Sequence, residues 1–339
     1  MPQAVISPIT SHWIIPFAAS LSAPCLHALP QLDALGALPN LRALLSALSV
    51  SARTEGDEFD LSMPHEQVLA AQMGWPTTDG LLPWATYWAD QDGVVLSKEM
   101  SVDRTWGLLS PGHWLMGRDH LTLLDPQALN LSEAQSRSLF DAVKPLFETD
   151  GWDLIWGGCN RWYASHASLQ DLPTASLDRV IGRNPDVWLT GHPQARLVRR
   201  LQSEVQMLLY QHPINDEREA AGLPSVNSFW LSGCGPTPHN MTLPTTTQLV
   251  TDLRSPLLAD DMAAWLQAWH HLDSTVFKQA CDALDAGQDI HITLCGECHA
   301  VTLSRPSNSS LSGKLWQSVK RLAGASKVPQ PSVFLASLS

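Results

Sequence analysis

The chain has 339 residues, of which 44% are apolar and 16% are charged. This composition excludes a disordered chain and allows one large domain or two modest ones. The net charge is −12, and residues 1–304 alone carry 16 basic against 33 acidic residues, a net charge of −17. Such an acidic body argues against nucleic acid as a partner, because binding to a phosphate backbone needs a basic surface.

Neither a membrane span nor a secretory signal is expected. No window holds the roughly 18 apolar residues that a transmembrane helix needs. No Lys or Arg precedes Arg42, so the basic segment typical of a secretory signal is missing. Six cysteines in a chain of this length do not form a small disulfide framework. We therefore expect a cytoplasmic protein with reduced thiols.

The first part of the chain alternates strand-like and helical patterns. Residues 12–18 predict a buried strand, residues 51–60 an acidic loop, and residues 152–158 and 162–164 two short strands. Helices are expected from Pro39 onward, over 64–73, and within 125–147, where Ser132 and Gln135 predict a capping box. The short strands indicate an inserted subdomain, which we place at about 75–190.

The second part predicts helices at 196–210 and 258–284, separated by a Pro- and Thr-rich crossing loop at 236–257. Strands are expected at 290–294 and 300–303. Residues 305–339 read as a basic, Ser-rich tail with a short amphipathic helix at 311–322, which would dock on the acidic body or on a partner. We predict a single α/β domain over 1–304, with a mixed central sheet flanked by helices.

Residues 212–235 form the most informative stretch. His212-Pro213-Ile214-Asn215 is followed by Arg218, by Gly222-Leu223-Pro224, and by an apolar run that ends in Gly233-Cys234-Gly235. Asp216 and Glu219 predict a cap for a short helix, and Gly222 its end. A buried strand that ends in a glycine turn is typical of the ligand-binding edge of an open α/β sheet. A structural corner without any chemistry fits the same residues equally well.

This stretch resembles a segment of the archaeal-type, cofactor-independent phosphoglycerate mutases, which reads His-Pro-(Val/Ile)-Asn, a nearby Arg, Gly-x-x-Pro, Ala-Asn, an aromatic strand and Gly-x-Gly. Over residues 13–303 the chain resembles still more closely an uncharacterised bacterial family of phosphoglycerate mutase-like proteins, often labelled regulatory proteins of the RpfE type. The resemblance implies a shortened fold of the alkaline-phosphatase superfamily. It also implies two divalent metals, such as Mn²⁺ or Mg²⁺, that would serve phosphoryl transfer.

The chain departs from this family where the chemistry would take place. The resemblance implies Asp-Gly after the first strand, but Pro16-Phe17-Ala18 stands there. It implies a Ser in a turn as the phosphoryl acceptor, and this chain offers a displaced Ser62. It implies Asp-His at the last core strand, which here ends in Cys295-Gly296-Glu297. His270, His271 and Asp273 could be remnants of the metal-binding residues, although they equally suit a polar helix face.

Three groups of residues are candidates for a site. Ser62, with His65 and Glu66 as an acid–base pair at a helix start, would be catalytic, although a helix cap is the alternative for Glu66. The ligand-binding candidates line the expected cleft or carry a guanidinium group that matches phosphate. They are His212, Asn215, Arg218, Asn227, Arg179 and Arg183. Structural pairing of the arginines with Asp178 or Asp216 is the alternative.

The third group is a zinc-binding set of three cysteines and a histidine. Its members would be Cys234, Cys295, Cys298 and His299, and ordinary core thiols are the alternative. The Cys-x-x-Cys-His spacing also matches haem attachment, which the missing export signal opposes.

Two functions follow from these observations. The first is a regulatory protein that has lost the two-metal site and binds a small anionic ligand or a protein in the old cleft. The second is an active metal-dependent phosphomutase or phosphatase with a rebuilt site. The missing Asp-Gly and Asp-His pairs favour the first.

Overall fold

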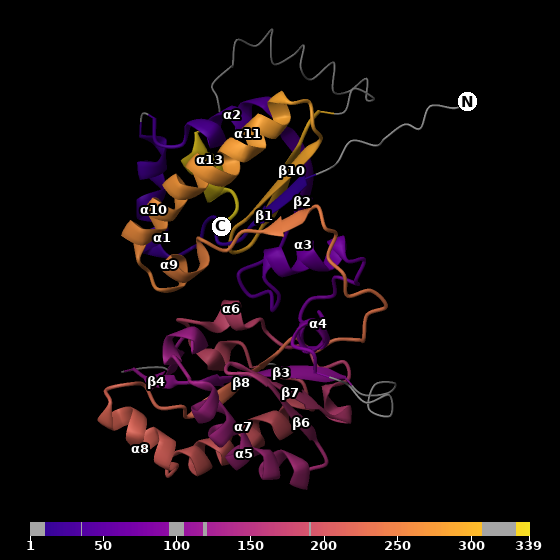
Figure 1. Ribbon diagram of the computed structural model, residues 1–339, viewed down its shortest axis with the longest axis vertical. Helices are drawn as coiled ribbons and strands as arrows, with labels where there is room; N and C mark the ends of the chain where they lie inside the picture. The colour runs from indigo at the N-terminus through magenta and orange to yellow at the C-terminus, as the bar shows by residue number, and fades with distance from the viewer. Residues whose placement is uncertain (1–10, 35, 95–104, 118–120, 190, 307–329) are drawn as a thin grey trace, which may run out of the picture. The chain divides into compact units, whose positions relative to one another are not determined.

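The computed structural model describes residues 11–34, 36–94, 105–117, 121–189, 191–306 and 330–339 (Figure 1). The chain divides into two compact units. The first unit consists of Met1–Glu58 and Leu243–Ser339, and the second unit of Phe59–Thr242. The expected insertion at about 75–190 falls within the second unit. None of the helices in the described ranges is long and apolar enough to cross a membrane.

The first unit contains a mixed five-stranded sheet with the order β2-β11-β10-β1-β9. Its strands are β1 (Ser11–Ile15), β2 (Ser49–Thr54), β9 (Thr247–Leu249), β10 (Ile290–Cys295) and β11 (Ala300–Ser304). Strand β1 is parallel to both β9 and β10, whereas β11 is antiparallel to β10 and β2. This sheet and its helices confirm the predicted α/β class with a mixed central sheet.

The predictions of two loops from the sequence are partly wrong. The acidic loop at 51–60 begins within β2, an edge strand whose residues are almost all exposed, so it lacks the apolar alternation that marks a half-buried strand. The crossing loop at 236–257 contains β9 and the start of α9 (Arg254–Leu258). Strand β9 has only three residues, too few for a recognisable period.

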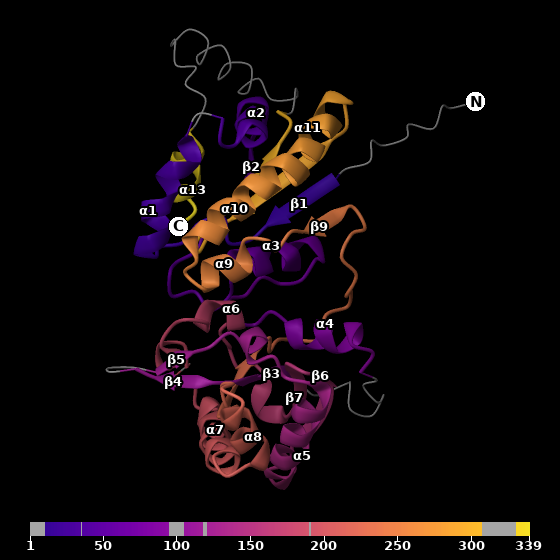
Figure 2. The same ribbon diagram turned by 60° about the vertical axis from the view of Figure 1, so that its left-hand side comes forward.

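Helices of the first unit pack beside this sheet (Figure 1, Figure 2). They are α1 (Ala23–Ala28), η1 (Leu29–Asp33), α2 (Pro39–Ala47), α10 (Met262–Leu272), η5 (Asp273–Phe277), α11 (Lys278–Asp285) and α13 (Pro331–Ala336). The helix expected at 258–284 is interrupted by η5, a π-helical turn. Helix α13 packs on η1, and the Ser332 hydroxyl donates to the Asp33 carboxylate. The expected amphipathic helix at 311–322 lies outside the described residues.

The second unit is built on a four-stranded antiparallel sheet with the order β6-β7-β3-β8. Its strands are β3 (Trp106–Gly112), β6 (Asp153–Gly158), β7 (Arg161–Ser165) and β8 (Ser228–Ser232), with a separate hairpin of β4 (Trp114–Met116) and β5 (Leu121–Leu123). Strand β8 is therefore an edge strand of an antiparallel sheet. The prediction that the strand before Gly233 feeds the ligand edge of an open α/β sheet is wrong, because that rule applies to parallel strands.

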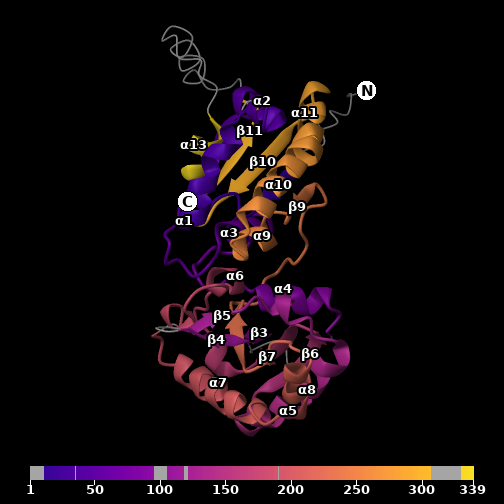
Figure 3. The same cartoon turned by 90° about the vertical axis from the view of Figure 1, so that its left-hand side faces the viewer.

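Helices cover both faces of this second sheet (Figure 3). The helices of the second unit are α3 (Pro64–Gln72), α4 (Trp84–Gln91), η2 (Pro126–Leu129), α5 (Glu133–Thr149), η3 (Ala167–Leu169), α6 (Leu177–Val180), η4 (Pro185–Val187), α7 (Ala195–Leu209) and α8 (Pro213–Ala220), and α4, α5 and α7 are among those that pack on the sheet. Helix α4 packs on Leu108 and Tyr163 on one face, whereas α5 and α7 pack on Leu109 and Trp162 on the other. The predicted capping box of Ser132 and Gln135 is confirmed at the start of α5.

Gly233 and Gly235 allow β8 to end against the start of α4. A Cβ on Gly233 would lie 2.7 Å from the amide nitrogen of Ala85, and a Cβ on Gly235 would overlap the carbonyl of Leu81. The glycine turn after β8 is therefore explained by close packing of two backbones in the second unit.

Candidate functional site

Hydrogen bonds join the first turn of α3 to the first turn of α6. Glu66 Oε2 accepts from the Met63 amide at 3.0 Å, and Glu66 Oε1 accepts from the Ser176 hydroxyl at 2.8 Å. Arg179 donates through Nη2 to the Ser62 carbonyl at 3.2 Å. Two segments 110 residues apart in the sequence thus form one polar cluster. We call it the α3–α6 cluster and define it as Ser62, His65, Glu66, Ser176, Asp178 and Arg179.

Glu66 has a pKa raised from 4.5 to about 7. Burial is the main cause, because it disfavours the charged carboxylate, and the charge of Asp178 adds to the rise. The Met63 amide, the Ser176 hydroxyl and Arg179 oppose it. Beside it in the sequence, His65 Nε2 lies 3.9 Å from Asp178 Oδ2. The cluster therefore combines a carboxyl that titrates near neutrality with a His–Asp pair, which are groups suited to proton transfer.

Ser62 is buried, and its polar atoms fix the turn before α3. Its Oγ accepts from the Gly80 amide at 2.9 Å, and its own amide donates to Asp79 Oδ1 at 2.8 Å. The other oxygen of Asp79 accepts from the Leu61 amide at 3.0 Å. These bonds tie two loops of the second unit together. A nucleophilic role for Ser62 stays a prediction.

Arg179 and Arg183 share one aromatic neighbour. Their guanidinium carbons lie 5.8 and 5.9 Å from the centre of the Trp188 ring, within the range of a cation–π contact. Arg179 is only 1% exposed, whereas Arg183 is half-buried. Of the three predicted anion-binding arginines, Arg179 and Arg218 are each 1% exposed, so Arg183 is the one that solvent and a small ligand can reach.

The helix within the motif at residues 212–227 is capped by a different residue from the one predicted. The His212 side chain, and not that of Asp216, caps α8 and accepts from the Ile214 amide at 3.3 Å. The prediction of Asp216 as the cap is wrong because Pro213 occupies the first helical position and so begins the helix earlier. Gly222, with φ of 69°, ends the helix as expected.

Two asparagines of the same motif bind backbone groups within the second unit. Asn215 Nδ2 donates to the carbonyls of Leu209 and Val226 at 2.8 Å each, and Asn215 Oδ1 accepts from the Val226 amide at 2.8 Å. Asn227 bonds to the amide and the carbonyl of Trp114 at 2.8 and 3.1 Å. These bonds fix the turn between α8 and β8, and both amides would have to release them to contact a ligand.

Arg218 is 1% exposed and binds three oxygens from different segments. Nε donates to the Pro224 carbonyl at 2.8 Å, Nη1 to Gln135 Oε1 at 3.1 Å, and Nη2 to the Leu129 carbonyl at 2.6 Å. Burial lowers the pKa of its guanidinium. The arginine thus joins α8, α5 and η2 from inside the second unit.

The four residues of the predicted zinc set belong to different units. Cys234 lies in the second unit, and the other three, Cys295, Cys298 and His299, lie in the first. Burial raises the pKa of the Cys234 thiol to about 12 and also raises that of Cys295. His299 Nδ1 accepts from the Gly56 amide at 3.2 Å. Over the described ranges, no three His, Cys, Asp or Glu residues are grouped so as to hold a metal ion.

The end of β1 in the first unit carries apolar side chains. Phe17 is 3% exposed and has φ of 60°, a backbone conformation that is rare for a bulky residue. The Trp265 indole donates to the Phe17 carbonyl at 3.2 Å, and the Ala18 amide donates to the Cys295 carbonyl at 2.9 Å. A Cβ on Gly296 would overlap the Leu338 carbonyl, so the C-terminal residues cover the end of β10.

Asp273 has a structural task at the start of α2. Its carboxylate accepts from the amides of Asn40 and Leu41 at 3.3 and 2.8 Å, and from Asn40 Nδ2 at 3.1 Å. A carboxylate at a helix N-terminus satisfies amides that have no partner within the helix. His270 Nδ1 is 3.0 Å from the Ala37 carbonyl. Asp273 therefore acts as the cap that the sequence Leu38-Pro39-Asn40 lacks.

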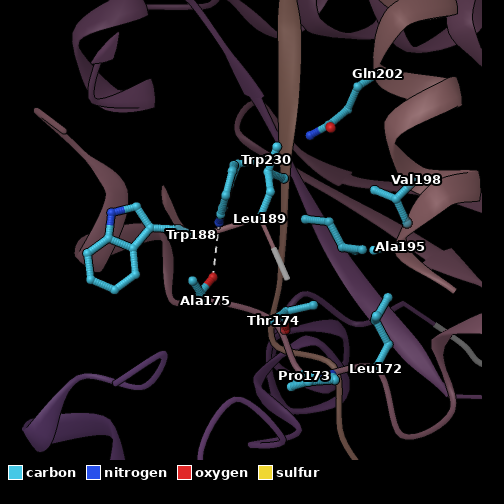
Figure 4. A pocket seen from close by; sticks show the side chains of 11 residues that line it. Leu172, Pro173, Thr174, Ala175, Trp188, Leu189, Ala195, Val198, Gln202 and Trp230 are labelled. Carbon is cyan, nitrogen blue, oxygen red and sulfur yellow. Dashed lines mark hydrogen bonds between the residues drawn. The ribbon is translucent and has the colours of Figure 1, made fainter. Parts of the chain in front are cut away.

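A pocket in the second unit was missed by the sequence-based interpretation (Figure 4). Its lining residues are spread over two loops, α7 and β8, and no short motif holds them together. They are Leu172, Pro173, Thr174, Ala175, Trp188, Leu189, Ala195, Val198, Gln202, Trp230 and Leu231. The one available signal was the 14 Trp residues, which indicate a ligand cleft or a core with polar seams.

The structure is similar to that of a cofactor-independent phosphoglycerate mutase from Thermoplasma acidophilum DSM 1728. The two chains are 15% identical over 88% of this chain and 90% of the other, with a TM-score of 0.36. It is also similar to the PH0037 protein from Pyrococcus horikoshii, at 13% identity over 89% and 88% of the two chains and a TM-score of 0.43. No protein-family model and no curated protein matches the chain.

Proposed function

We propose that this protein is a phosphoglycerate mutase-like protein that has lost the two-metal phosphoryl-transfer site and acts in a cytoplasmic regulatory role by binding a small anionic ligand or a protein. The observation that carries this proposal is the end of β1. A two-metal site needs carboxylate or imidazole ligands at the ends of the core strands. Phe17 and Trp265 fill this position instead, so the residues present there do not fit such a site.

The polar residues named by the motif support the same proposal. Asn215, Arg218 and Asn227 hold backbone carbonyls and amides inside the second unit. A motif whose side chains maintain a turn can persist after an activity has gone, because its loss would cost stability. Arg183, half-buried on the face of Trp188, is the cation that we place at the anion site.

The test combines an activity assay with a binding assay. We expect no phosphoglycerate mutase or phosphatase turnover with Mn²⁺, Mg²⁺, Zn²⁺ or Co²⁺. We also expect thermal stabilisation by 3-phosphoglycerate that is weakened in Arg183→Ala and kept in Arg199→Ala, the matched change of an exposed arginine on α7. Turnover that requires a metal and disappears in Ser62→Ala would overturn the proposal.

The alternative function is a metal-dependent phosphomutase or phosphatase with a rebuilt site in the α3–α6 cluster. The observation in its favour is the pKa of Glu66 near 7, beside the His65–Asp178 pair. Under this alternative, Glu66→Gln would abolish metal-dependent turnover without changing the fold. Metal analysis of protein purified without added zinc tests the Cys₃His set; less than about a tenth of an equivalent would exclude it.

A further inference from the structure

Residues 330–339 are held on the first unit by hydrogen bonds at both ends of helix α13. Near its start, the Ser332 amide donates to Asp33 Oδ1 at 3.1 Å, and the Ser332 hydroxyl donates to the other oxygen of that carboxylate. Near its end, Arg53 Nη2 donates to the Ser337 carbonyl at 3.2 Å. Helix α13 also packs on η1, and Figure 2 shows it beside α1. The segment is therefore docked on residues that are distant from it in the sequence.

The turn between β10 and β11 holds the last residues of this segment. The Leu338 carbonyl accepts from the amides of Cys298 and His299, at 3.2 and 3.0 Å. A Cβ on Gly296 would overlap the same carbonyl, so the close approach requires a glycine. We call the residues that receive the segment the 330–339 docking surface. They are Asp33, Arg53, Gly296, Cys298 and His299.

Two leucines anchor the segment. Leu335 and Leu338 are both 0% exposed, and the Leu338 amide donates to the Leu335 carbonyl at 2.9 Å, which places them one turn apart. Val333, by contrast, is 64% exposed. Full burial of a leucine contributes about 1.5–3 kcal/mol. Because a helix as short as α13 is not stable alone in water, the segment owes its helical form to these contacts, as a bound peptide does.

The docking surface is held in place by contacts that do not involve the segment. Arg42 Nη2 lies 3.9 Å from Asp33 Oδ1. The Gly296 amide donates to the His299 carbonyl at 2.8 Å, which closes the turn between β10 and β11, and the Gly56 amide donates to His299 Nδ1 at 3.2 Å. A surface that is already ordered loses little conformational entropy when a peptide binds. These contacts can keep the surface intact when the segment leaves it.

We propose that the 330–339 docking surface is an exchangeable site, which releases the segment of its own chain and binds the same segment of a second copy of the protein. Residues 307–329 span at most about 80 Å when fully extended, which is enough to cross to another copy. Reciprocal exchange gives a closed two-fold dimer in which every contact described above is kept. Within one chain the segment has an effective concentration on the order of millimolar, so the wild-type dimer is expected at comparable protein concentrations.

Two full-length variants test the exchange. Leu335→Asp places a charge at a fully buried position, so this variant keeps the docking surface and loses its own segment from it. Gly296→Leu blocks the surface and leaves its segment available to another copy. In a 1:1 mixture we expect a heterodimer with a dissociation constant below about 0.1 mM, measured by analytical ultracentrifugation. Self-association of each variant alone is expected to be at least about tenfold weaker.

Val333→Asp is the matched control, because it places the same charge at an exposed position of α13. Its own segment is expected to stay docked, so it should not bind the Gly296→Leu variant. If Gly296→Leu does not fold, a labelled peptide of residues 330–339 replaces it as the donor. Fluorescence anisotropy should then show binding to Leu335→Asp that is at least about tenfold tighter than binding to Val333→Asp. Leu338→Asp replaces Leu335→Asp as the acceptor if the latter does not fold.

Three results would overturn the proposal. The first is the absence of both heterodimer and peptide binding, and the second is equal binding by the Val333→Asp control. The third is loss of the fold in both Leu335→Asp and Leu338→Asp, because the surface would then need the segment in order to exist. The proposal concerns the first unit, and none of its readouts involves a phosphate compound or a metal, so its failure is distinct from a failure of the proposed function.

Discussion

In the first unit, the ends of the parallel strands β1 and β10 carry Phe17 and Cys295, which are buried, and ionisable residues such as Asp273 cap helices instead. In the second unit, ionisable residues gather between α3 and α6, where Glu66 titrates near neutrality. Phe17 and Cys295 thus bury the ends of these two strands, and the carboxylate of nearby Glu297 accepts from the Leu21 amide. The α3–α6 cluster and the pocket lie in the unit whose sheet is antiparallel.

This difference teaches that a motif can mark a scaffold without marking a reaction. The residues His212 to Gly235 hold the second unit together through buried hydrogen bonds. Glu66, whose pKa is raised to about 7, lies outside that motif. The following predictions test whether residues 212–235 of the second unit and the Asp273 cap of the first unit stabilise the fold. They also test whether the α3–α6 cluster contains a carboxyl that titrates near neutrality.

The largest effect is expected at Arg218. Arg218→Leu removes three hydrogen bonds and leaves two buried carbonyls without partners, so the free energy of unfolding should fall by about 4 kcal/mol. Urea denaturation measures the loss, with Arg199→Leu as the exposed control. A loss below about 1 kcal/mol would show that Arg218 does not hold the second unit together.

Asp273 tests the first unit in the same way. Asp273→Ala leaves the amides of Asn40 and Leu41 without an acceptor, and we expect a loss of about 2 kcal/mol. Asp282→Ala on the exposed face of α11 is the control. If the variant is as stable as the wild-type protein but loses affinity for a divalent metal, Asp273 is a metal ligand and not a cap.

Glu66 gives the α3–α6 cluster a pH dependence. Because its pKa is raised from 4.5 to about 7 in the folded state, the folded protein binds the proton more tightly than the unfolded chain. The stabilisation is complete below about pH 4.5 and is lost as the pH rises through 7, by about 3 kcal/mol in total. Denaturation from pH 4.5 to 8 should show this fall in the wild-type protein.

Glu66→Gln should flatten the fall, whereas Glu217→Gln, on the exposed face of α8, should leave it unchanged. A wild-type profile that rises over this range would mean that the pKa of Glu66 lies below its ordinary value.

The smallest effect is expected at Gly222. A side chain there has open space around it, but φ of 69° is unfavourable for any residue with a Cβ. Gly222→Ala should cost about 1 kcal/mol. Gly158→Ala, where a Cβ meets only ordinary contacts and φ is not in the left-handed region, is the control. Equal stability of the two variants would show that the left-handed conformation of Gly222 at the end of α8 does not require glycine.

Periodicity in the sequence predicted most of the long elements. Helix α7, the capping box of α5 and strands β1, β10 and β11 lie within a few residues of their expected positions. The exposed strand β2 and the short strand β9 were missed, because pairing with a neighbour and not apolar alternation defines them. The cap of α8 was misplaced because Pro213 sets the first helical position before any acidic residue can.

The sequence by itself determined the α/β class, the acidic body and the residue types that could carry chemistry, because these depend on composition and local period. Which of those residues are engaged in packing was decided only by the tertiary structure. Arg218 carries a guanidinium group that could bind an anion, yet it donates hydrogen bonds to three oxygens from other segments of the chain. Gln202 attracts no attention in the sequence, yet α7, β8 and two loops place its amide in an apolar pocket. Burial and hydrogen bonding join residues far apart in the chain, and no local pattern encodes them.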